Sequence, residues 1–344
     1  PVLKYHQLLY VSVGLKIKQF VIWLLNLFGN MLTPTNYILN DFKYNIIIIR
    51  RIALIFWSRK NCSWGFPYSF ALGLSPLVIG LTIVAFGTSL PEMVVSLAAA
   101  KDSSSIAIGN VIGSNIANVG LVLGISAFIF PLTITYANIR KDLFIYLIAA
   151  LIFIYFCSDG LISSGEGAIL FVGIIVYTWY AITHPRHQVE KDSHGKDSMS
   201  KCFFYLLIGS IFLYFGSKLF VEGAVYLAEL LGVSKMVIGM SVVALGTSLP
   251  ELATSIVAAF QKESGISVGN IIGSNLFNIL SVIGLVSFLY PLHVPTDIMK
   301  FEIPFMLAFG VVLFPITLMK QPIPKITSGI LIAGYLTFII LLFN

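Results

Sequence analysis

The chain has 344 residues, of which 58% are hydrophobic and only 10% are charged, and its formal net charge is +6. A mean hydropathy of +0.94 excludes a soluble globular domain and predicts a polytopic membrane protein. In a membrane protein, the positions of the positive charges beside the spans indicate the orientation of the chain. The net positive charge is therefore not taken as evidence of nucleic-acid binding. The three scattered cysteines, Cys62, Cys157 and Cys202, predict neither a disulfide framework nor a metal cluster.

The first 70 residues differ from the rest of the chain. They are rich in Asn, Ile, Tyr and Lys, and their apolar run Ile46–Trp57 is interrupted by Arg50 and Arg51. Residues 59–70 are polar and aromatic where a membrane helix is expected. After residue 70 the composition changes abruptly and becomes rich in Gly, Ala, Ser and Leu. We therefore treat residues 1–70 as an atypical N-terminal segment.

Apolar segments dominate the remainder, and each is long enough to cross a bilayer at about 20 residues per span, although one is short. The main hydrophilic stretch is residues 184–201, which we predict to be a cytoplasmic linker between residues 71–183 and 202–344. The predicted spans are 74–100, 106–131, 142–157 (the short one), 161–182, 203–231, 234–260, 266–291, 303–319 and 324–343.

The two halves are copies of each other. Residues 74–100 align without gaps with 233–259 and are identical at 15 of 27 positions. Residues 106–125 and 266–285 are identical at 10 of 20 positions. Shared apolar composition would give only about one identity in ten, so the chain contains an internal repeat.

The repeat predicts the topology. The second half has five spans, and the first half has four clear ones plus a first helix expected near residues 44–72. Five is an odd number, so the halves have opposite orientations. With the linker in the cytoplasm, the inside loops hold eleven Lys and Arg and the outside loops only three, with both termini outside. We predict an all-α polytopic protein of about ten transmembrane helices in two inverted five-helix repeats, multi-pass in a bacterial inner membrane.

Each half carries the motif Gly-Thr-Ser-Leu-Pro-Glu, which ends at Glu92 and at Glu251. A carboxylate at membrane depth costs a few kcal/mol and marks a functional site by default. Two carboxylates neutralise one divalent ion. Pro91 and Pro250 lack an N–H and are expected to free carbonyls one turn earlier, near Ala85, Thr88, Ala244 and Thr247. Such oxygens suit hard cations such as Ca²⁺ and Na⁺.

The alternative is that the glutamates pair with cations of the protein itself. Lys218 is the well-buried candidate, but Glu222 lies four residues on, a spacing that favours pairing on one helix face.

A second repeated motif, Gly-Asn-x-Ile-Gly-Ser-Asn-x-x-Asn, occupies residues 109–118 and 269–278. Its glycines are expected to allow close helix packing. Its serine and last asparagine lie four residues apart on one helix face, so we predict that both line an ion path. For Asn110 and Asn270 we favour interhelical hydrogen bonding.

Together these motifs resemble the cation/calcium antiporter superfamily, and in particular prokaryotic sodium/calcium exchangers, over about residues 71–344. The resemblance implies two motif helices that cross at mid-membrane and a secondary antiporter that exchanges Ca²⁺ for Na⁺ by alternating access. It implies calcium and sodium ions and the bilayer as partners, with no cofactor and no nucleic acid. The implied ion ligands are Glu92, Glu251, Thr88, Thr247, Ser89, Ser248, Ala85, Ala244, Ser114, Ser274, Asn118 and Asn278.

Other functions stay open at this point. Many exchangers of the family carry Asp where this chain has Asn278, which leaves the Na⁺ stoichiometry and proton coupling undecided. Proton/calcium exchange, potassium-dependent exchange, a passive cation channel and an inactive product are the alternatives. The sequence does not give the oligomeric state. No phosphate loop, nucleophile triad or His/Cys cluster occurs, so an enzyme is not expected.

A shifted reading frame would explain the N-terminal segment. The codons of residues 59–70, read one nucleotide later, permit a string with a Val-x-Gly-Ala core, as expected for the missing first helix. We therefore hypothesise a frameshift near codon 70, with an inactive product if the mutation is real. Resequencing the gene tests this hypothesis, which fails if the shifted frame does not encode a Gly/Ala-rich apolar helix.

Overall fold

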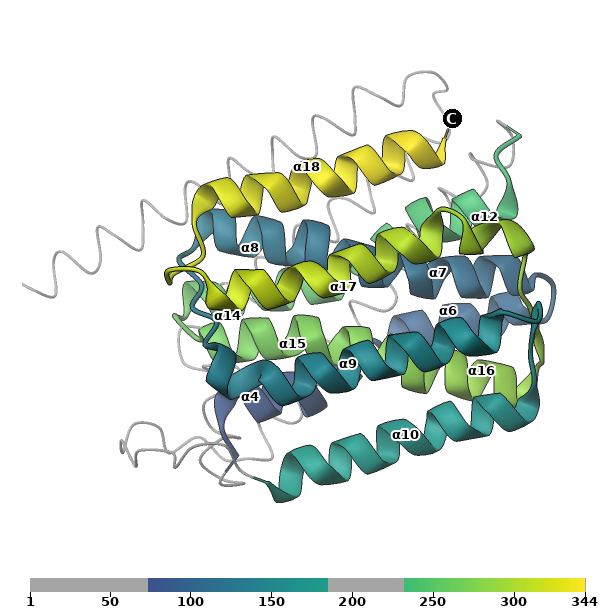
Figure 1. The fold of residues 1–344 in the computed structure, drawn as a ribbon, viewed down its shortest axis with the longest axis horizontal. Helices are drawn as coiled ribbons and strands as arrows, with labels where there is room; N and C mark the ends of the chain where they lie inside the picture. Colours follow the sequence, from purple (N-terminus) through teal and green to yellow (C-terminus); the bar gives the residue numbers. More distant parts are fainter. Residues whose placement is uncertain (1–73, 185–231, 344) are drawn as a thin grey trace, which may run out of the picture. The chain divides into compact units, whose positions relative to one another are not determined.

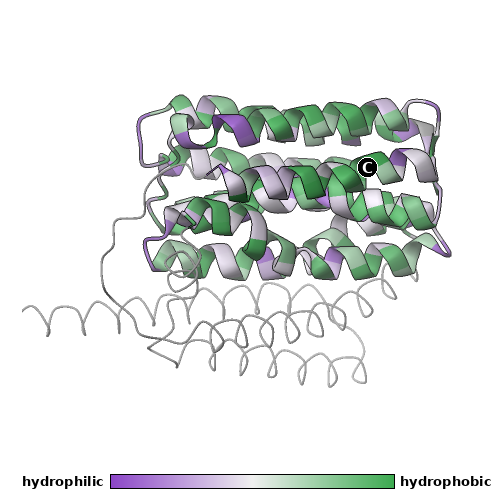
Figure 2. Cartoon of the chain, turned by 90° about the horizontal axis from the view of Figure 1, so that it is seen from below, coloured by the Kyte–Doolittle hydropathy of each residue, from purple (hydrophilic) through white to green (hydrophobic). Residues whose placement is uncertain are grey.

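A computed structural model describes residues 74–184 and 232–343. The predictions made for residues 1–70, for nearly all of the linker and for the span 203–231, with Lys218, lie outside the described residues. Within them the chain is almost entirely helical, and the long helices run side by side along one direction with loops at both ends (Figure 1). Figure 2 shows hydrophobic residues along the helices and hydrophilic residues concentrated at the two ends.

In the described residues, each half starts with a helix broken into pieces, continues with a second long helix, and ends with two further helices. The first half comprises α4 (Pro76–Ile79), η1 (Gly80–Val84), α5 (Ala85–Thr88), α6 (Leu90–Ala100), α7 (Ser104–Ala117), η2 (Asn118–Leu123), α8 (Gly124–Ile129), α9 (Tyr136–Cys157), β1 (Leu161–Ile162) and α10 (Ser164–Thr183). The second half comprises α12 (Lys235–Ile238), η3 (Gly239–Val243), α13 (Ala244–Thr247), α14 (Leu249–Phe260), α15 (Ser264–Leu276), η4 (Phe277–Ile283), α16 (Gly284–Leu289), β2 (Leu292–His293), η5 (Thr296–Met299), α17 (Glu302–Leu318) and α18 (Lys325–Leu342).

The described residues contain six helices long and apolar enough to cross a membrane, or seven if the bent pair Pro76–Thr88 and Leu90–Ala100 is one span. These seven match predicted spans. Helix α9 corresponds to the short prediction 142–157, but it begins earlier, at Tyr136, and has 22 residues. It is not among the six because Arg140, Lys141 and Asp142 place three charged residues near its start. The count of ten helices is not confirmed.

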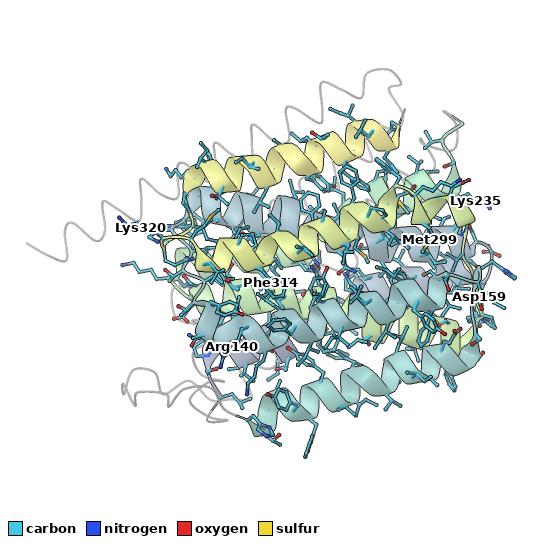
Figure 3. All side chains as sticks on the ribbon, in the orientation of Figure 1. Arg140, Asp159, Lys235, Met299, Phe314 and Lys320 are labelled. Carbon is cyan, nitrogen blue, oxygen red and sulfur yellow. The ribbon has the colours of Figure 1, made fainter. Side chains whose placement is uncertain are left out.

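The inversion of the repeats is visible in α9 and α17, which are equivalent at the repeat offset of 160 residues. Arg140 lies near the start of α9 and Lys320 just after the end of α17, and both lie at the same end of the bundle (Figure 3). Asp159 and Lys235 lie at the opposite end. Equivalent helices therefore run in opposite directions, and the predicted opposite orientation of the halves is confirmed.

Backbone hydrogen bonds between extended loop segments connect the two repeats. At one site β1 pairs with β2 in an antiparallel sheet, and the Val294 amide donates to the Gly160 carbonyl at 2.8 Å. At the equivalent site the Ile323 amide donates to the Leu132 carbonyl at 2.9 Å. Leu132 corresponds to Leu292 of β2 at the same offset of 160 residues, so equivalent loop segments are joined by backbone hydrogen bonds at both places.

Glycines let the two halves approach closely. A Cβ atom added at Gly273 would lie 2.6 Å from the Leu81 carbonyl oxygen and 2.7 Å from the Ala85 Cβ. A Cβ at Gly113, its counterpart, would overlap the Met240 carbonyl of the other repeat. The predicted close packing at the second motif is therefore confirmed.

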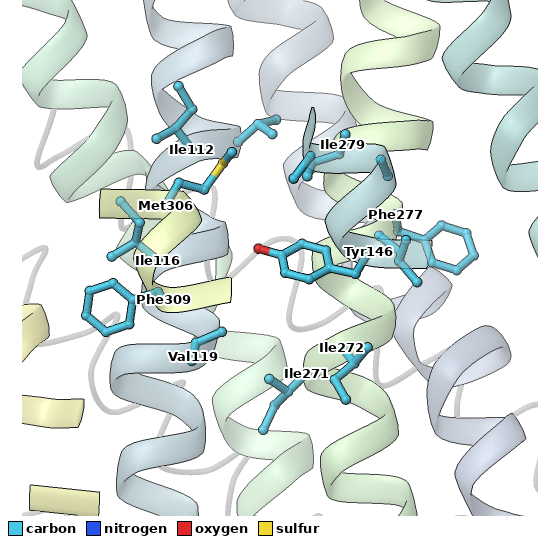
Figure 4. Packing of buried hydrophobic residues seen from close by; sticks show 14 of the residues in the cluster. Ile112, Ile116, Val119, Tyr146, Ile271, Ile272, Phe277, Ile279, Met306 and Phe309 are labelled. Atoms are coloured by element: carbon cyan, nitrogen blue, oxygen red, sulfur yellow. The ribbon is translucent and has the colours of Figure 1, made fainter. Parts of the chain in front are cut away.

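The core around these contacts is apolar. Figure 4 shows the Tyr146 ring projecting from α9 toward α17 among buried isoleucines and Met306. A Cβ at Gly310 of α17 would lie 2.7 Å from that ring, so α9 and α17 pack ring against backbone.

Candidate ion-binding site

Glu92 and Glu251 are fully buried, with 0% exposure. Each lies in the first turn of a helix that starts inside the protein, Glu92 in α6 and Glu251 in α14. The partial positive charge of a helix N-terminus stabilises a carboxylate there. Among the described residues, the Oε2 atom of each glutamate has no hydrogen-bond partner. Buried polar atoms are nearly always satisfied, so these two oxygens fit a positively charged ligand.

The break before each glutamate lies at a serine. Ser89 has φ −85° and ψ 2°, and Ser248 has φ −83° and ψ 2°. These values depart from the α-helical region and end the preceding helix. At Ser89 the two parts of the helix are bent by 40°. The break exposes the N-terminus of the following half-helix, where the carboxylate lies.

One expectation about this break is wrong. The carbonyls of Ala85 and Ala244 are not freed, because they accept the N–H groups of Ser89 and Ser248 at 2.9 and 3.0 Å. The last helical turn before each serine therefore still closes. The donor that Pro91 lacks would have served the carbonyl four residues earlier, not that of Ala85.

Each glutamate carboxylate accepts a hydrogen bond from a serine hydroxyl of the opposite repeat. Ser248 Oγ donates to Glu92 Oε1 at 3.5 Å, and Ser89 Oγ donates to Glu251 Oε1 at 3.2 Å. Ser274 Oγ lies 3.4 Å from the same Glu251 oxygen. The two motifs, far apart in the sequence, therefore meet at one buried site.

The motif threonines also lie in this network. Thr88 Oγ1 is 3.3 Å from Ser274 Oγ, and Thr247 Oγ1 is 3.5 Å from Ser114 Oγ. Ser114 Oγ also approaches the Ala244 carbonyl at 3.5 Å. The structure thus brings together the hydroxyls of both repeats that the sequence singled out.

Asn118 and Asn278 are buried at the other end of the second motif. Asn118 Nδ2 donates to Asn275 Oδ1 at 3.0 Å, across the two repeats. Within the described ranges Asn118 Oδ1 and both polar atoms of Asn278 have no hydrogen-bond partner. Within the same ranges no hydrogen bond links either residue to a glutamate, so neither is part of the carboxylate hydrogen-bond network.

No cation of the protein pairs with the glutamates in the part of the chain that the structure describes. There the ion pair is Lys300–Asp297, 3.0 Å long and exposed. Those residues also contain no group of three or more His, Cys, Asp and Glu side chains that would hold a metal ion. The site is built from carboxylate, hydroxyl, amide and carbonyl oxygens, which is the ligand chemistry of hard cations.

Sequence reasoning missed Ser96 and Ser255 as members of the network. Asn110 Nδ2 donates to Ser96 Oγ at 2.9 Å, and Asn270 Nδ2 donates to Ser255 Oγ at 3.1 Å. Both serines are buried and are identical between the repeats. That identity is the signal that could have found them.

Comparison with known proteins identifies the family. Residues 46–183 and 201–344 match the family described as sodium/calcium exchanger protein. The match begins inside the N-terminal segment 1–70, whose atypical character stays a prediction.

Two curated relatives extend over most of the chain. The sodium/calcium exchanger MaX1 of Methanosarcina acetivorans is 33% identical over 316 residues, covering 79% of this chain and 90% of the relative. The inner membrane protein YrbG of Escherichia coli is 31% identical over 277 residues, covering 76% of this chain and 84% of the relative.

A solved structure agrees in fold. The sodium-calcium exchanger NCX_Mj, soaked with 10 mM Na⁺ and zero Ca²⁺, superposes with a TM-score of 0.70 at 30% sequence identity. The comparison covers 88% of this chain and 98% of that one. With its inverted helical repeats and its family match, this chain is a multi-pass integral membrane transporter, not an enzyme, and it belongs to the sodium/calcium exchanger protein family.

Proposed function

We propose that this chain is a secondary active antiporter that moves Ca²⁺ outward as Na⁺ moves inward, by alternating access. The observation that carries the proposal is the matched pair Glu92 and Glu251. Both are fully buried, and each keeps one carboxylate oxygen without a partner among the described residues. Two carboxylates balance the charge of one Ca²⁺, and Na⁺ takes the same kinds of oxygen ligand.

The glutamates are the central ligands in this proposal. The surrounding hydroxyls and carbonyls complete the coordination of Ca²⁺ or of Na⁺ in turn. The proposed surrounding ligands are Thr88, Thr247, Ser89, Ser248, Ala85, Ala244, Ser114, Ser274, Asn118 and Asn278. The carbonyls of Ala85 and Ala244 accept an N–H group each, and a carbonyl oxygen has a second lone pair for a cation.

Alternating access follows from the inverted repeats. A site at the interface of two oppositely oriented halves can be reached from either face when one part moves against the other. The broken helices present their N-termini and irregular backbone to this interface, where such backbone is tolerated in a membrane.

Flux through reconstituted vesicles tests the proposal. Uptake of ⁴⁵Ca²⁺ by the full chain is measured with Na⁺, K⁺ and pH gradients imposed separately. An outward Na⁺ gradient is expected to drive Ca²⁺ uptake. Uptake that needs a K⁺ or pH gradient would contradict sodium coupling, uptake without any counter-ion gradient would indicate a channel, and no uptake would indicate an inactive product.

Replacement of Asn278 by Asp is expected to change the Na⁺ or pH dependence of flux more than the Ca²⁺ affinity. The change adds a carboxylate beside the central pair, where it can bind Na⁺ or a proton. The measurement is initial ⁴⁵Ca²⁺ uptake over a range of Na⁺ concentrations and pH values. Asn278→Ala, which adds no charge, is the control. Unchanged Na⁺ and pH dependence in Asn278→Asp would remove Asn278 from the proposed site.

A further inference from the structure

The same polar arrangement occurs twice beside the glutamates, first around Asn110. The Asn110 side chain is fully buried. Its Nδ2 atom donates to the backbone carbonyl of Glu92 at 3.4 Å and to Ser96 Oγ at 2.9 Å. Its Oδ1 atom accepts the hydroxyl of Thr247, from the other repeat, at 3.0 Å. One amide thus joins the backbone of a glutamate to a threonine across the interface.

Asn270 makes the equivalent contacts. Its Nδ2 atom donates to the Glu251 carbonyl at 3.4 Å and to Ser255 Oγ at 3.1 Å. Its Oδ1 atom accepts the hydroxyl of Thr88 at 3.0 Å. Two independent copies of one geometry, each using a residue from the opposite repeat, indicate a shared role.

Hydrogen-bond chemistry fixes the orientation of each amide. A backbone carbonyl only accepts, so the nitrogen of Asn110 must face the Glu92 carbonyl. The amide oxygen then faces Thr247, and because that oxygen only accepts, the hydroxyl must present its proton to it. The assignment of nitrogen and oxygen therefore follows from the partners of the amide.

Further acceptors near each threonine hydroxyl are carbonyls of its own helix and the serine hydroxyl across the interface, which is 3.3 Å from Thr88 Oγ1 and 3.5 Å from Thr247 Oγ1. Thr88 Oγ1 is 3.3 Å from the Ala85 carbonyl. Thr247 Oγ1 is 3.0 Å from the Val243 carbonyl and 3.3 Å from that of Ala244. A hydroxyl has one proton, and the asparagine amide oxygen, 3.0 Å from each threonine Oγ1, is nearer than the serine Oγ across the interface. The oxygen lone pairs are then left for a cation.

We propose that Asn110 and Asn270 are positioning residues that hold the hydroxyl protons of Thr247 and Thr88 away from the transported cation. Each threonine oxygen then faces the cation with its lone pairs, as an oxygen ligand must. This inference rests on the proposed function. It gives the two asparagines a role in cation affinity in addition to joining the helices.

The test is Na⁺-driven ⁴⁵Ca²⁺ uptake by the reconstituted full chain, with the half-saturating Ca²⁺ concentration and the maximal rate per inserted protein measured separately. Asn110→Ala and Asn270→Ala are each expected to raise the half-saturating Ca²⁺ concentration about tenfold, the effect of one lost buried hydrogen bond. The maximal rate is expected to change less. Ser126→Ala is the control, because this buried hydroxyl has no partner among the described residues and lies outside the network.

A double-mutant cycle separates positioning from simple helix packing. Thr247 is the hydrogen-bond partner of Asn110. The double variant Asn110→Ala/Thr247→Val is therefore expected to have the same half-saturating Ca²⁺ concentration as Thr247→Val alone. Thr88 is not hydrogen-bonded to Asn110. In the double variant Asn110→Ala/Thr88→Val, the fold-increases in half-saturating Ca²⁺ concentration of the two single variants are therefore expected to multiply. If the alanine variants fail to insert, Ser96→Ala and Ser255→Ala loosen the same amides and should raise the half-saturating concentration about threefold.

The outcomes are distinct. Normal wild-type uptake with unchanged half-saturating Ca²⁺ in the Asn110 and Asn270 variants, or identical behaviour of bonded and crossed pairs, overturns the positioning role alone. Absence of Na⁺-driven uptake in the wild type overturns the proposed function, and the positioning role with it.

Discussion

Replacement of Glu92 or Glu251 by Gln is expected to abolish Ca²⁺ transport while the protein still inserts into the membrane. Each change removes half of the negative charge that faces a divalent ion. Loss of one partner from a buried ionic contact costs about 3 kcal/mol or more, which corresponds to about a 100-fold loss of Ca²⁺ affinity. The measurement is Na⁺-driven ⁴⁵Ca²⁺ uptake per inserted protein.

The matched control for these variants is Glu302→Gln. Glu302 also lies in the first turn of a membrane helix, α17, but it belongs to neither motif. Its replacement is expected to leave Ca²⁺ flux near the wild-type value. Near-normal flux in either Glu92→Gln or Glu251→Gln would show that the proposed site is wrong.

Replacement of Gly273 by Ala is expected to destabilise the protein and to weaken Ca²⁺ transport. The new Cβ would lie 2.6 Å from the Leu81 carbonyl and 2.7 Å from the Ala85 Cβ. Neither backbone can yield without moving the two repeats apart, and overpacking of this kind costs about 1–3 kcal/mol. Because Ala85 lies one turn before the motif serine, the displacement reaches the site. Thermal unfolding in detergent and the half-saturating Ca²⁺ concentration are the two measurements.

Gly329→Ala is the control for this steric effect. Gly329 lies in α18, and among the residues that the structure describes no atom beyond its own helix backbone lies within 4 Å of its added Cβ. The substitution improves helix propensity by about 1 kcal/mol, so its unfolding temperature should equal or exceed that of the wild type. Equal unfolding temperatures for Gly273→Ala and Gly329→Ala would contradict the close approach of the repeats at Gly273.

The sequence predicted the fold because the repeat carries most of the information. Identical motifs in two halves with an odd number of spans require inversion, and α9 and α17 do run in opposite directions. The start of α9 was missed because Arg140 and Lys141 reduce hydropathy without interrupting a helix. Hydropathy reports burial in lipid, whereas helix ends depend on backbone geometry.

For the site, the repeat indicated which residues matter but not how they pair. That Ser89 bonds Glu251 and Ser248 bonds Glu92 depends on how the halves pack, which no local pattern contains. The carbonyl of Ala85 was misjudged for a related reason, since the turn closes onto it before the helix breaks at Ser89. The role of Asn110 emerged only when its partner in the other repeat was known.

Equilibrium binding of ⁴⁵Ca²⁺ to the purified protein at rising Na⁺ concentration tests the shared site most directly. Na⁺ is expected to lower the apparent Ca²⁺ affinity without changing the binding capacity, because in the proposed site both ions use Glu92 and Glu251. The double variant Glu92→Gln/Glu251→Gln is expected to lose this binding. Ca²⁺ binding that is indifferent to Na⁺, or that survives in the double variant, would show that the two ions do not share this site.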